Sequence, residues 1–349
     1  MGRPMRSTLG LAALFLLAAC SASPGARPEP AAVGAAVPTS PLRLERVRLA
    51  YGAPSGGFAT PWMARDAGLF ERYGLDVEIV YISSSPTMLQ SMLAGELQFG
   101  ELAAPASMNA YLESGEVVWI TGAVNRPILY VVGLPEIQRL DDLRGRAVGV
   151  TRLGTTTHTF MKLALRSVGL DVERDVQILQ TGGTPETLAA LQTGRIAAGV
   201  TGPPTHLQAL EAGMRIVADL ADLGIAWPFG GSITTKSYIA SHPETVRGYV
   251  KAYTEAVYLL RTDRERSIAV LQKGGQVDDP RLAEQTWDAF RDRYTLPPYP
   301  DATAMEAVVR EELAATNPKA AEIPPTAYYD DRFVRELDEN GFVRGLLAR

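Results

Sequence analysis

Short apolar runs alternate with polar loops and with stretches of helical periodicity along most of the chain. Residues 47–51 and 77–82 have the pattern of β-strands, and residues 61–73 between them have helical spacing that stops at Gly74. Similar signals predict strands at 97–100, 117–124, 147–150, 176–180, 196–200 and 215–218, an extended run at 230–235, and helices after 86, 158, 185 and 241. This repeating order of strand, loop and helix predicts an α/β fold.

Two segments of this pattern repeat one another. The pentapeptide Gly-Leu-Asp-Val-Glu at 74–78 recurs letter for letter at 169–173. Four later positions also recur with identical spacing: Pro86, Gly95, Gly100 and Pro105 correspond to Pro185, Gly194, Gly199 and Pro204. We therefore expect two similar α/β lobes with a cleft between them rather than one continuous sheet.

The beginning of the chain predicts export and attachment to a membrane. Arg3 and Arg6 precede an apolar run at 9–19 that is too short to span a bilayer, and Cys20 follows it. Residues 1–19 resemble a bacterial lipoprotein signal peptide, which implies that Cys20 is lipidated. An ordinary cleaved signal with an incidental cysteine is the alternative. Residues 20–41, rich in Ala, Pro, Gly and Ser, are predicted to be a flexible tether.

The rest of the chain is predicted to form two lobes with discontinuous boundaries. Residues 42–126 and 233–349 would form lobe one, and residues 127–232 would form lobe two. The chain would cross between the lobes near 125–129 and 227–234, and these two crossings would form the hinge. The helices after 241 have no partner strands of their own, so we expect them to pack on lobe one.

Several motifs in this frame resemble one protein family. The stretch at 61–78, PWMARDAGLFERYGLDVE, is similar to the opening of the nitrate, taurine and aliphatic-sulfonate group of ABC-transporter substrate-binding proteins, which is related to thiamine-pyrimidine synthases. The similarity continues through 142–150 and 242–244 and covers nearly everything after the tether. It implies a type II periplasmic-binding-protein fold of two Rossmann-like lobes with a two-strand hinge. It also implies a small-molecule solute, and an ABC permease and ATPase as partners.

Composition and charge narrow the classes of function. The net charge of −5 argues against nucleic acid as a partner. The three histidines lie far apart, and neither a P-loop nor a cluster of metal ligands is visible, so we expect no enzyme, cofactor or metal. One enzyme of this fold, a pyrimidine synthase, is cytosolic and has a cysteine-rich working motif, from which an exported chain with one cysteine departs. A monomeric binding protein is the main prediction, and a sensory partner of a membrane receptor is the alternative.

The solute is expected where the loops after the strands lead into helix N-termini. Free N–H groups and partial positive charge there suit an anion or a carbonyl without any lysine or arginine. The predicted ligand-binding residues in these loops are Ser55, Gly56, Ser83, Ser84, Ser85, Gly154, Thr155, Thr156, Thr157, Gly182 and Thr184. Plain helix capping is the alternative for each of these hydroxyl groups.

Four residues outside those loops are further candidates for the site. Glu101 follows the third strand of lobe one and is expected to face the cleft, where its carboxylate would favour a ligand bearing a hydrogen-bond donor. A solvated or internally bonded Glu101 is the alternative. Asn125 lies at the first crossing, and Trp227 and Phe229, on either side of Pro228, are candidates to stack on a ring. The identity and charge of the solute stay open.

Overall fold

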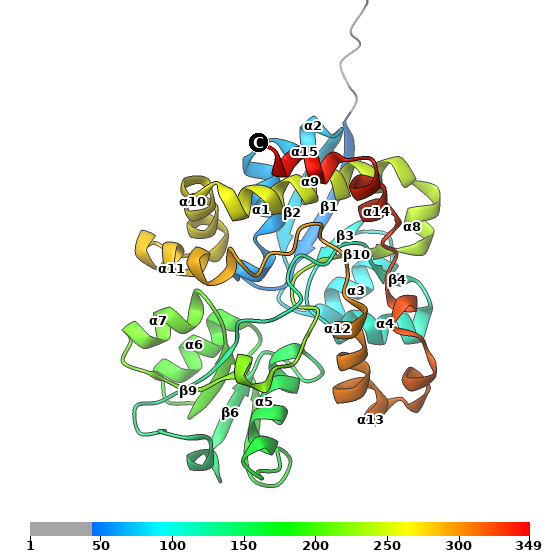
Figure 1. Ribbon diagram of the computed structural model, residues 1–349. Coiled ribbons are helices and arrows are strands. Elements are labelled where there is room, and N and C mark those ends of the chain that lie inside the picture. Colours follow the sequence, from blue (N-terminus) through cyan, green and yellow to red (C-terminus); the bar gives the residue numbers. More distant parts are fainter. Residues whose placement is uncertain (1–43) are drawn as a thin grey trace, which may run out of the picture. The chain divides into compact units, whose positions relative to one another are not determined.

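Two five-stranded mixed sheets form the framework of residues 44–349, the part of the chain that the computed structural model describes (Figure 1). The first sheet has the order β2-β1-β3-β10-β4, and its strands are β1 (Glu45–Tyr51), β2 (Leu75–Tyr81), β3 (Phe99–Glu101), β4 (Val117–Trp119) and β10 (Ser232–Thr235). The second sheet has the order β7-β6-β8-β5-β9, and its strands are β5 (Tyr130–Gly133), β6 (Ala147–Val150), β7 (Gln177–Gln180), β8 (Ala198–Thr201) and β9 (Arg215–Asp219). The predicted two-lobe α/β architecture is confirmed.

The two sheets share one topology. In each, the three strands in positions one to three are parallel, and the strand in position four, β10 or β5, runs antiparallel to both neighbours. This fourth strand is the one that lies next to a crossing between the lobes in the sequence. In each lobe, the three parallel strands therefore come from one continuous stretch of the chain.

The sequence repeat marks equivalent positions in the two lobes. Gly74 and Gly169 each end a helical segment with a left-handed backbone, at φ 86° and 74°, a conformation that costs little only for glycine. Pro86 and Pro185 each lie in the first turn of the helix after the second strand, where a missing N–H group is harmless. The repeat is thus a repeat of backbone requirements.

Helices cover both sheets. In lobe two these are α5 (Thr156–Ser167), α6 (Thr184–Gln192) and α7 (Thr205–Glu211). Lobe one carries α1 (Thr60–Asp66), α2 (Leu69–Arg72), α3 (Ser85–Leu93), α4 (Ala106–Ser114), α8 (Lys236–Ser241), α9 (Pro243–Thr262), α10 (Arg264–Gly275), α11 (Pro280–Phe290), α12 (Ala302–Val308), α13 (Ala314–Thr316), α14 (Arg332–Glu339) and α15 (Phe342–Leu347). Figure 1 shows α9 across the first sheet, and it contacts α1, α2, α14 and α15. The helices after 241 therefore pack mainly on lobe one, as predicted.

Shorter helical turns join these elements. Five are 3-10 turns: η1 (Gly56–Phe58), η2 (Leu140–Leu143), η3 (Leu220–Leu223), η5 (Pro318–Glu322) and η6 (Pro325–Tyr328). The sixth, η4 (Val309–Leu313), is a π-helical turn between α12 and α13. Within residues 44–349, no helix is both long and apolar enough to cross a membrane. The predicted signal peptide, tether and lipidation at Cys20 lie outside the described residues.

Some elements differ from the predictions. The helix expected at 61–73 is two helices, because Gly68 takes a left-handed backbone, φ 63°, between α1 and α2. The strand expected at 117–124 ends at Trp119, because the N–H groups of Ile120 and Thr121 both donate to the one Ser232 carbonyl and the regular ladder stops there. Strand β5 was not predicted, since its four residues follow directly on an apolar crossing segment with no turn signal between them.

The two crossings between the sheets lie side by side. The Val124 N–H donates to the Gly230 carbonyl at 2.9 Å, and the Gly230 N–H donates back to the Val124 carbonyl at 3.0 Å. The Trp227 N–H donates to the Asn125 carbonyl at 2.9 Å in the same antiparallel arrangement. Paired connections of this kind permit rotation of one lobe against the other. The residue boundaries of the lobes stay a prediction.

Candidate functional site

A cavity of about 80 Å³ lies between the two lobes, at the carboxyl ends of the parallel strands. Residues after β1, β2 and β3 line it from lobe one, and residues after β6, β7 and β8 line it from lobe two. In full, the lining residues are Gly52, Ala53, Ser55, Phe58, Ser83, Ser85, Leu102, Ala103, Ala106, Leu129, Thr151, Thr155, Thr156, Thr157, Gly183, Thr184, Gly202, Thr205 and Phe229. This is the place where open α/β sheets hold their ligands.

The structure brings together half of the residues predicted for the site. Those that line the cavity are Ser55, Ser83, Ser85, Thr155, Thr156, Thr157 and Thr184. Those outside its lining are Gly56, Ser84, Glu101, Asn125, Gly154, Gly182 and Trp227. Phe229, considered together with Trp227, does line it.

Five helices begin at residues that line the cavity, and α4 and α7 are two of them. The other three are α3, α5 and α6, whose first residues are Ser85, Thr156 and Thr184. No side chain caps α5 or α6, since Thr155 makes no capping bond and the N-cap of α6 is Gly183. Uncapped N–H groups and the positive end of each helix dipole favour a negatively charged or strongly accepting group at this place.

The threonines at the start of α5 have distinct roles. The Thr155 hydroxyl donates to the Arg152 carbonyl at 2.7 Å, and the Thr157 hydroxyl accepts from the Thr151 N–H at 3.0 Å. These bonds hold the loop between β6 and α5. The Thr184 hydroxyl at the start of α6 is buried and has no hydrogen-bond partner among the described residues. Because an unpaired buried hydroxyl is costly, Thr184 is the side chain most ready to bond a ligand.

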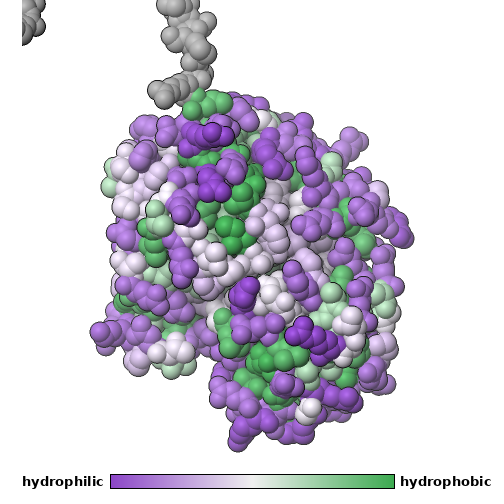
Figure 2. Space-filling view, turned by 180° about the vertical axis from the view of Figure 1, so that it is seen from behind, coloured by the Kyte–Doolittle hydropathy of each residue, from purple (hydrophilic) through white to green (hydrophobic). Residues whose placement is uncertain are grey.

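The remaining walls of the cavity are apolar and uncharged. The rings of Phe58 and Phe229 stack with their centres 5.6 Å apart, and Leu102 and Leu129 lie beside the cavity. None of its lining residues is ionisable. The outer surface differs, because hydrophilic residues spread over most of the face seen in Figure 2. The cavity therefore suits a ligand with an apolar part and a group that accepts hydrogen bonds.

Trp227 is a structural residue beside the cavity. Its side chain is fully buried, and its Nε1–H donates to the Thr156 hydroxyl at 3.1 Å and to the Ala104 carbonyl at 3.2 Å. The Thr156 hydroxyl also donates to the Ala104 carbonyl, which joins lobe two to lobe one. The structure does not place Trp227 where it would stack on a ligand. The sequence alone does not indicate that Trp227 bonds the cavity residue Thr156, because this contact depends on how distant segments fold together.

The predicted orientation of Glu101 toward the cleft is wrong. Its carboxylate is fully buried on the other side of β3, where it accepts hydrogen bonds from Ser232 Oγ at 2.7 Å and Tyr253 OH at 3.0 Å. Successive side chains on a strand point to opposite faces, and Leu102 rather than Glu101 lines the cavity. Burial raises the pKa of Glu101 to about 8, although both hydrogen bonds oppose the rise.

The other predicted residues outside the cavity have local roles. Ser84 caps α3, Gly56 packs under the ring of Phe290, and Asn125 Nδ2 donates to the Tyr299 carbonyl at 3.3 Å. The Gly154 N–H donates to His158 Nδ1 at 3.2 Å. Gly182 takes a left-handed backbone, φ 113°, next to Gly183. For Ser84 the capping alternative therefore holds.

Some residues that line the cavity were not predicted from the sequence. Ala106 and Thr205 begin α4 and α7, directly after the equivalent prolines Pro105 and Pro204. The repeat itself was a usable signal, because equivalent loops of two similar lobes face the same cleft. Leu129 offered none, since an apolar residue at a cavity wall looks like any core residue.

Proteins with related sequences are named for different solutes. The "Putative aliphatic sulfonates-binding protein" of Escherichia coli (strain K12) is 25% identical over 297 residues, 83% of this chain and 85% of that protein. The riboflavin-binding protein RibY of Chloroflexus aurantiacus (strain ATCC 29366 / DSM 635 / J-10-fl) is 25% identical over 255 residues, 70% of this chain and 71% of that protein. The chain is thus similar to binding proteins whose named solutes share little chemistry.

The fold also has a counterpart among solved structures. The structure of the periplasmic nitrate-binding protein NrtA from Synechocystis PCC 6803 matches with a TM-score of 0.69 and 13% identity, over 85% of this chain and 89% of that one. The family model described as NMT1/THI5 like matches residues 57–265, more than half of the 349 residues. The predicted resemblance is confirmed, and the chain belongs to the NMT1/THI5-like family.

Proposed function

We propose that this chain is a solute-binding lipoprotein, anchored outside the cytoplasm through Cys20, that delivers a small organic anion to the permease and ATPase of an ABC importer. The observation that carries the proposal is the cavity between two hinged lobes, lined by helix N-termini and hydroxyl groups. Reversible binding needs only such groups, whereas acid–base catalysis needs a titratable one within reach. A receptor role therefore fits this lining better than an enzymatic one.

The anionic class follows from the polarity of the lining. The uncapped starts of α5 and α6 present N–H donors, and Thr184 adds an unpartnered hydroxyl. A sulfonate, nitrate or carboxylate group accepts several such bonds at once and gains from the helix dipoles. Amines find no carboxylate in this lining. The names of the sulfonate-binding and nitrate-binding relatives agree with this choice.

The size of the cavity limits the apolar part of the solute. Its volume of about 80 Å³ is well below the ~150 Å³ of an apolar cavity that takes up benzene. A short alkyl group beside Phe58 and Phe229 fits such a space, and a flavin does not. A solute as large as that of the riboflavin-binding relative would require the lobes to part.

A ligand screen tests this class. We would measure thermal unfolding of the full chain with methanesulfonate, taurine, nitrate, acetate, a cationic amine and riboflavin. A solute present at a hundred times its Kd adds about 2.7 kcal/mol to the free energy of unfolding. We expect stabilisation by at least one organic anion and none by the amine. Stabilisation by the amine or riboflavin alone would contradict the anionic class.

Transport and anchoring need separate tests. Uptake of the stabilising solute should fall in cells that lack the chain and return when it is restored. Loss of a transcriptional response with unchanged uptake would instead indicate a sensor. The mass of the native protein should include a diacylglycerol on Cys20, and Cys20→Ala should move the protein from the membrane fraction to the soluble fraction. A membrane-bound Cys20→Ala variant would contradict the lipid anchor.

A further inference from the structure

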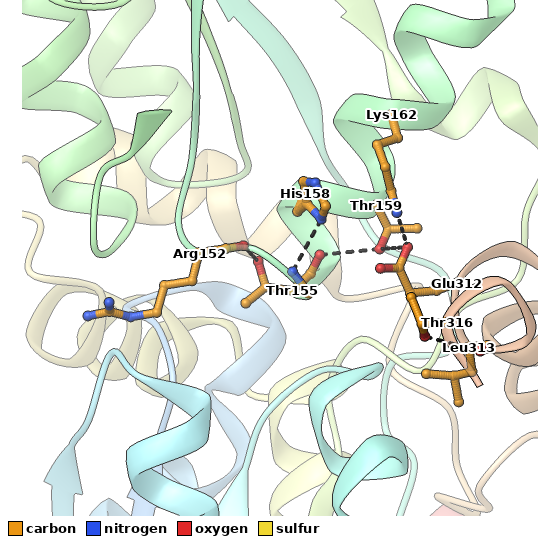
Figure 3. Close-up of polar contacts among 9 residues, drawn as sticks. Arg152, Thr155, His158, Thr159, Lys162, Glu312, Leu313 and Thr316 are labelled. Carbon is orange, nitrogen blue, oxygen red and sulfur yellow. Dashed lines mark hydrogen bonds and ion pairs between the residues drawn. The ribbon is translucent and has the colours of Figure 1, made fainter. Parts of the chain in front are cut away.

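One buried ion pair joins the two lobes away from the cavity. Glu312, in the π-helical turn η4, accepts a hydrogen bond from Lys162 Nζ at 2.5 Å and from Thr159 Oγ1 at 3.0 Å (Figure 3). Glu312 lies in the part of the chain after β10, which continues from lobe one. Lys162 and Thr159, its two donors, both lie on α5 of lobe two. Only 7% of the Glu312 side chain and 16% of the Lys162 side chain is exposed.

The carboxylate of Glu312 depends on lobe two for its partners. In the described part of the chain, Lys162 and Thr159 are its hydrogen-bond donors, and both would be lost when the lobes part. A buried charge is tolerated only when it is paired and hydrogen-bonded, so this contact favours the arrangement in which the lobes touch.

Helix α5 connects this ion pair to the cavity. Its first residues, Thr156 and Thr157, line the cavity, and Thr159 and Lys162 follow within the next two turns. A single rigid helix thus carries cavity residues at its start and the partners of Glu312 on its side. Movement of α5 away from lobe one would open the cavity and break the ion pair together.

A second ion pair between the lobes provides a contrast. Arg281 of α11 lies 3.5 Å from Glu211 of α7, but their side chains are 75% and 50% exposed. Exposed pairs of this kind contribute little, because water and salt screen them and flexible side chains must be ordered. The two pairs span the same two lobes and differ in burial, so they form a matched comparison.

We propose that Glu312, with Lys162 and Thr159, is a latch that sets the balance between open and closed lobes and so tunes solute affinity. The part that concerns affinity rests on the proposed solute-binding function. Loss of a charge-assisted hydrogen bond of this kind should lower the ratio of closed to open molecules roughly tenfold to a hundredfold. Apparent solute affinity is proportional to the closed fraction, so it should fall by the same factor as that fraction.

The test measures lobe closure without any solute. Exposed Glu96 in lobe one and Arg195 in lobe two are each replaced by Cys for a donor and an acceptor dye, in the full chain carrying Cys20→Ser. Single-molecule energy transfer then reports the closed population. We expect Glu312→Gln and Lys162→Met to lower the ratio of closed to open molecules at least tenfold, and the control Glu211→Gln to leave this ratio within about twofold. Circular dichroism checks that each variant is folded.

A charge exchange separates the ion pair from general damage to the interface. The double variant Lys162→Glu with Glu312→Lys keeps one positive and one negative partner, so it should regain much of the closed population. Unchanged closure in Glu312→Gln and Lys162→Met would overturn the latch, and so would a double variant that stays as open as the single ones. Because this measurement uses no solute, it stands even if the screen for an anionic solute fails.

Discussion

The Tyr253 hydroxyl of α9 donates a hydrogen bond to the fully buried Glu101 carboxyl of β3 across 3.0 Å. Tyr253 and Ser232 are the side chains that hydrogen-bond this carboxyl in the described part of the chain, and no cation balances it there. Burial is the main cause that raises the pKa of Glu101 to about 8. This group is therefore a stability element of lobe one rather than a ligand contact.

The raised pKa gives a pH dependence with a definite sign. In the unfolded chain the Glu101 carboxyl loses its proton near its ordinary pKa of 4.5, whereas the folded protein retains the proton up to about pH 8. Between these values the folded state binds more protons, so the contribution to the free energy of unfolding is full below pH 4.5 and declines as the pH rises toward 8. The decline should approach about 1.4 kcal/mol per pH unit.

Urea unfolding at several pH values checks this. Glu101→Gln should remove that slope, because an amide keeps hydrogen-bonding capacity and does not titrate. The difference between the two stability curves should therefore widen in favour of the variant as the pH rises from 5 to 8. Parallel curves for the two proteins would show that Glu101 does not titrate in this range.

The repeat predicts equal costs at two distant positions. Gly74→Ala and Gly169→Ala should each lower the free energy of unfolding by about 1–2 kcal/mol, because both glycines have a left-handed backbone that alanine tolerates poorly. Gly345→Ala, within helix α15, is the control and should stabilise by about 0.5–1 kcal/mol. A small effect at one of the two repeat positions alone would show that the lobes are not equivalent there.

The fold could be predicted from the sequence because the backbone conformations at helix ends and first turns favour particular residues at those positions. Gly74, Gly169 and the paired prolines are required by helix ends and first turns, so their spacing revealed two similar lobes and the loops that face the cleft. The direction in which the Glu101 side chain points could not be predicted from neighbouring residues in this way. Its strand is buried on both faces, with Phe99, Gly100 and Glu101 all inaccessible, so no polar alternation marks the side that faces the cavity.

Contacts between distant segments were also beyond the sequence. Lys162 and Glu312 are separated by 150 positions, and neither lies in a motif. Phe58 and Leu129 line the cavity, but in the sequence these apolar residues look like any residues of the core. The hydroxyl-rich loops were found because helix N-termini recruit Ser and Thr whether they bind ligands or not. The same chemistry left capping and binding indistinguishable for Ser84 and Thr184.

Thr184 now separates these two roles. Thr184→Val removes a buried hydroxyl that has no partner in the described residues, so the free energy of unfolding should stay the same or rise slightly. Binding of an anionic solute should weaken by roughly 1–3 kcal/mol, the cost of losing one hydrogen bond in a closed site. Thr193→Val, at the exposed far end of the same helix, is the control. Calorimetry that finds equal affinities for both variants would place the solute elsewhere.

Protonation of His158 is expected to make solute binding depend on pH. Its Nδ1 accepts the N–H of Gly154 at 3.2 Å and so supports the loop that leads to Thr155. Burial lowers the pKa of His158 below 6.5, and Lys162 adds to this effect, while Glu312 and Glu173 oppose it. A protonated imidazole has no acceptor, so the bond to Gly154 is lost once the pH falls through this lowered pKa.

Affinity for an anionic solute should therefore be constant at neutral pH and fall in acid below the ordinary histidine pKa of 6.5. His158→Asn keeps a side chain that can accept a hydrogen bond but does not titrate, so its affinity should change less across the same range. Titration calorimetry from pH 7.5 to pH 5 with an anion that stays ionised throughout, such as methanesulfonate, measures both proteins. His206→Asn serves as the control, since His206 stacks on Tyr130 and does not line the cavity. If wild type and His158→Asn lose affinity in parallel, the acid sensitivity belongs to another group, and the bond to Gly154 does not govern the loop.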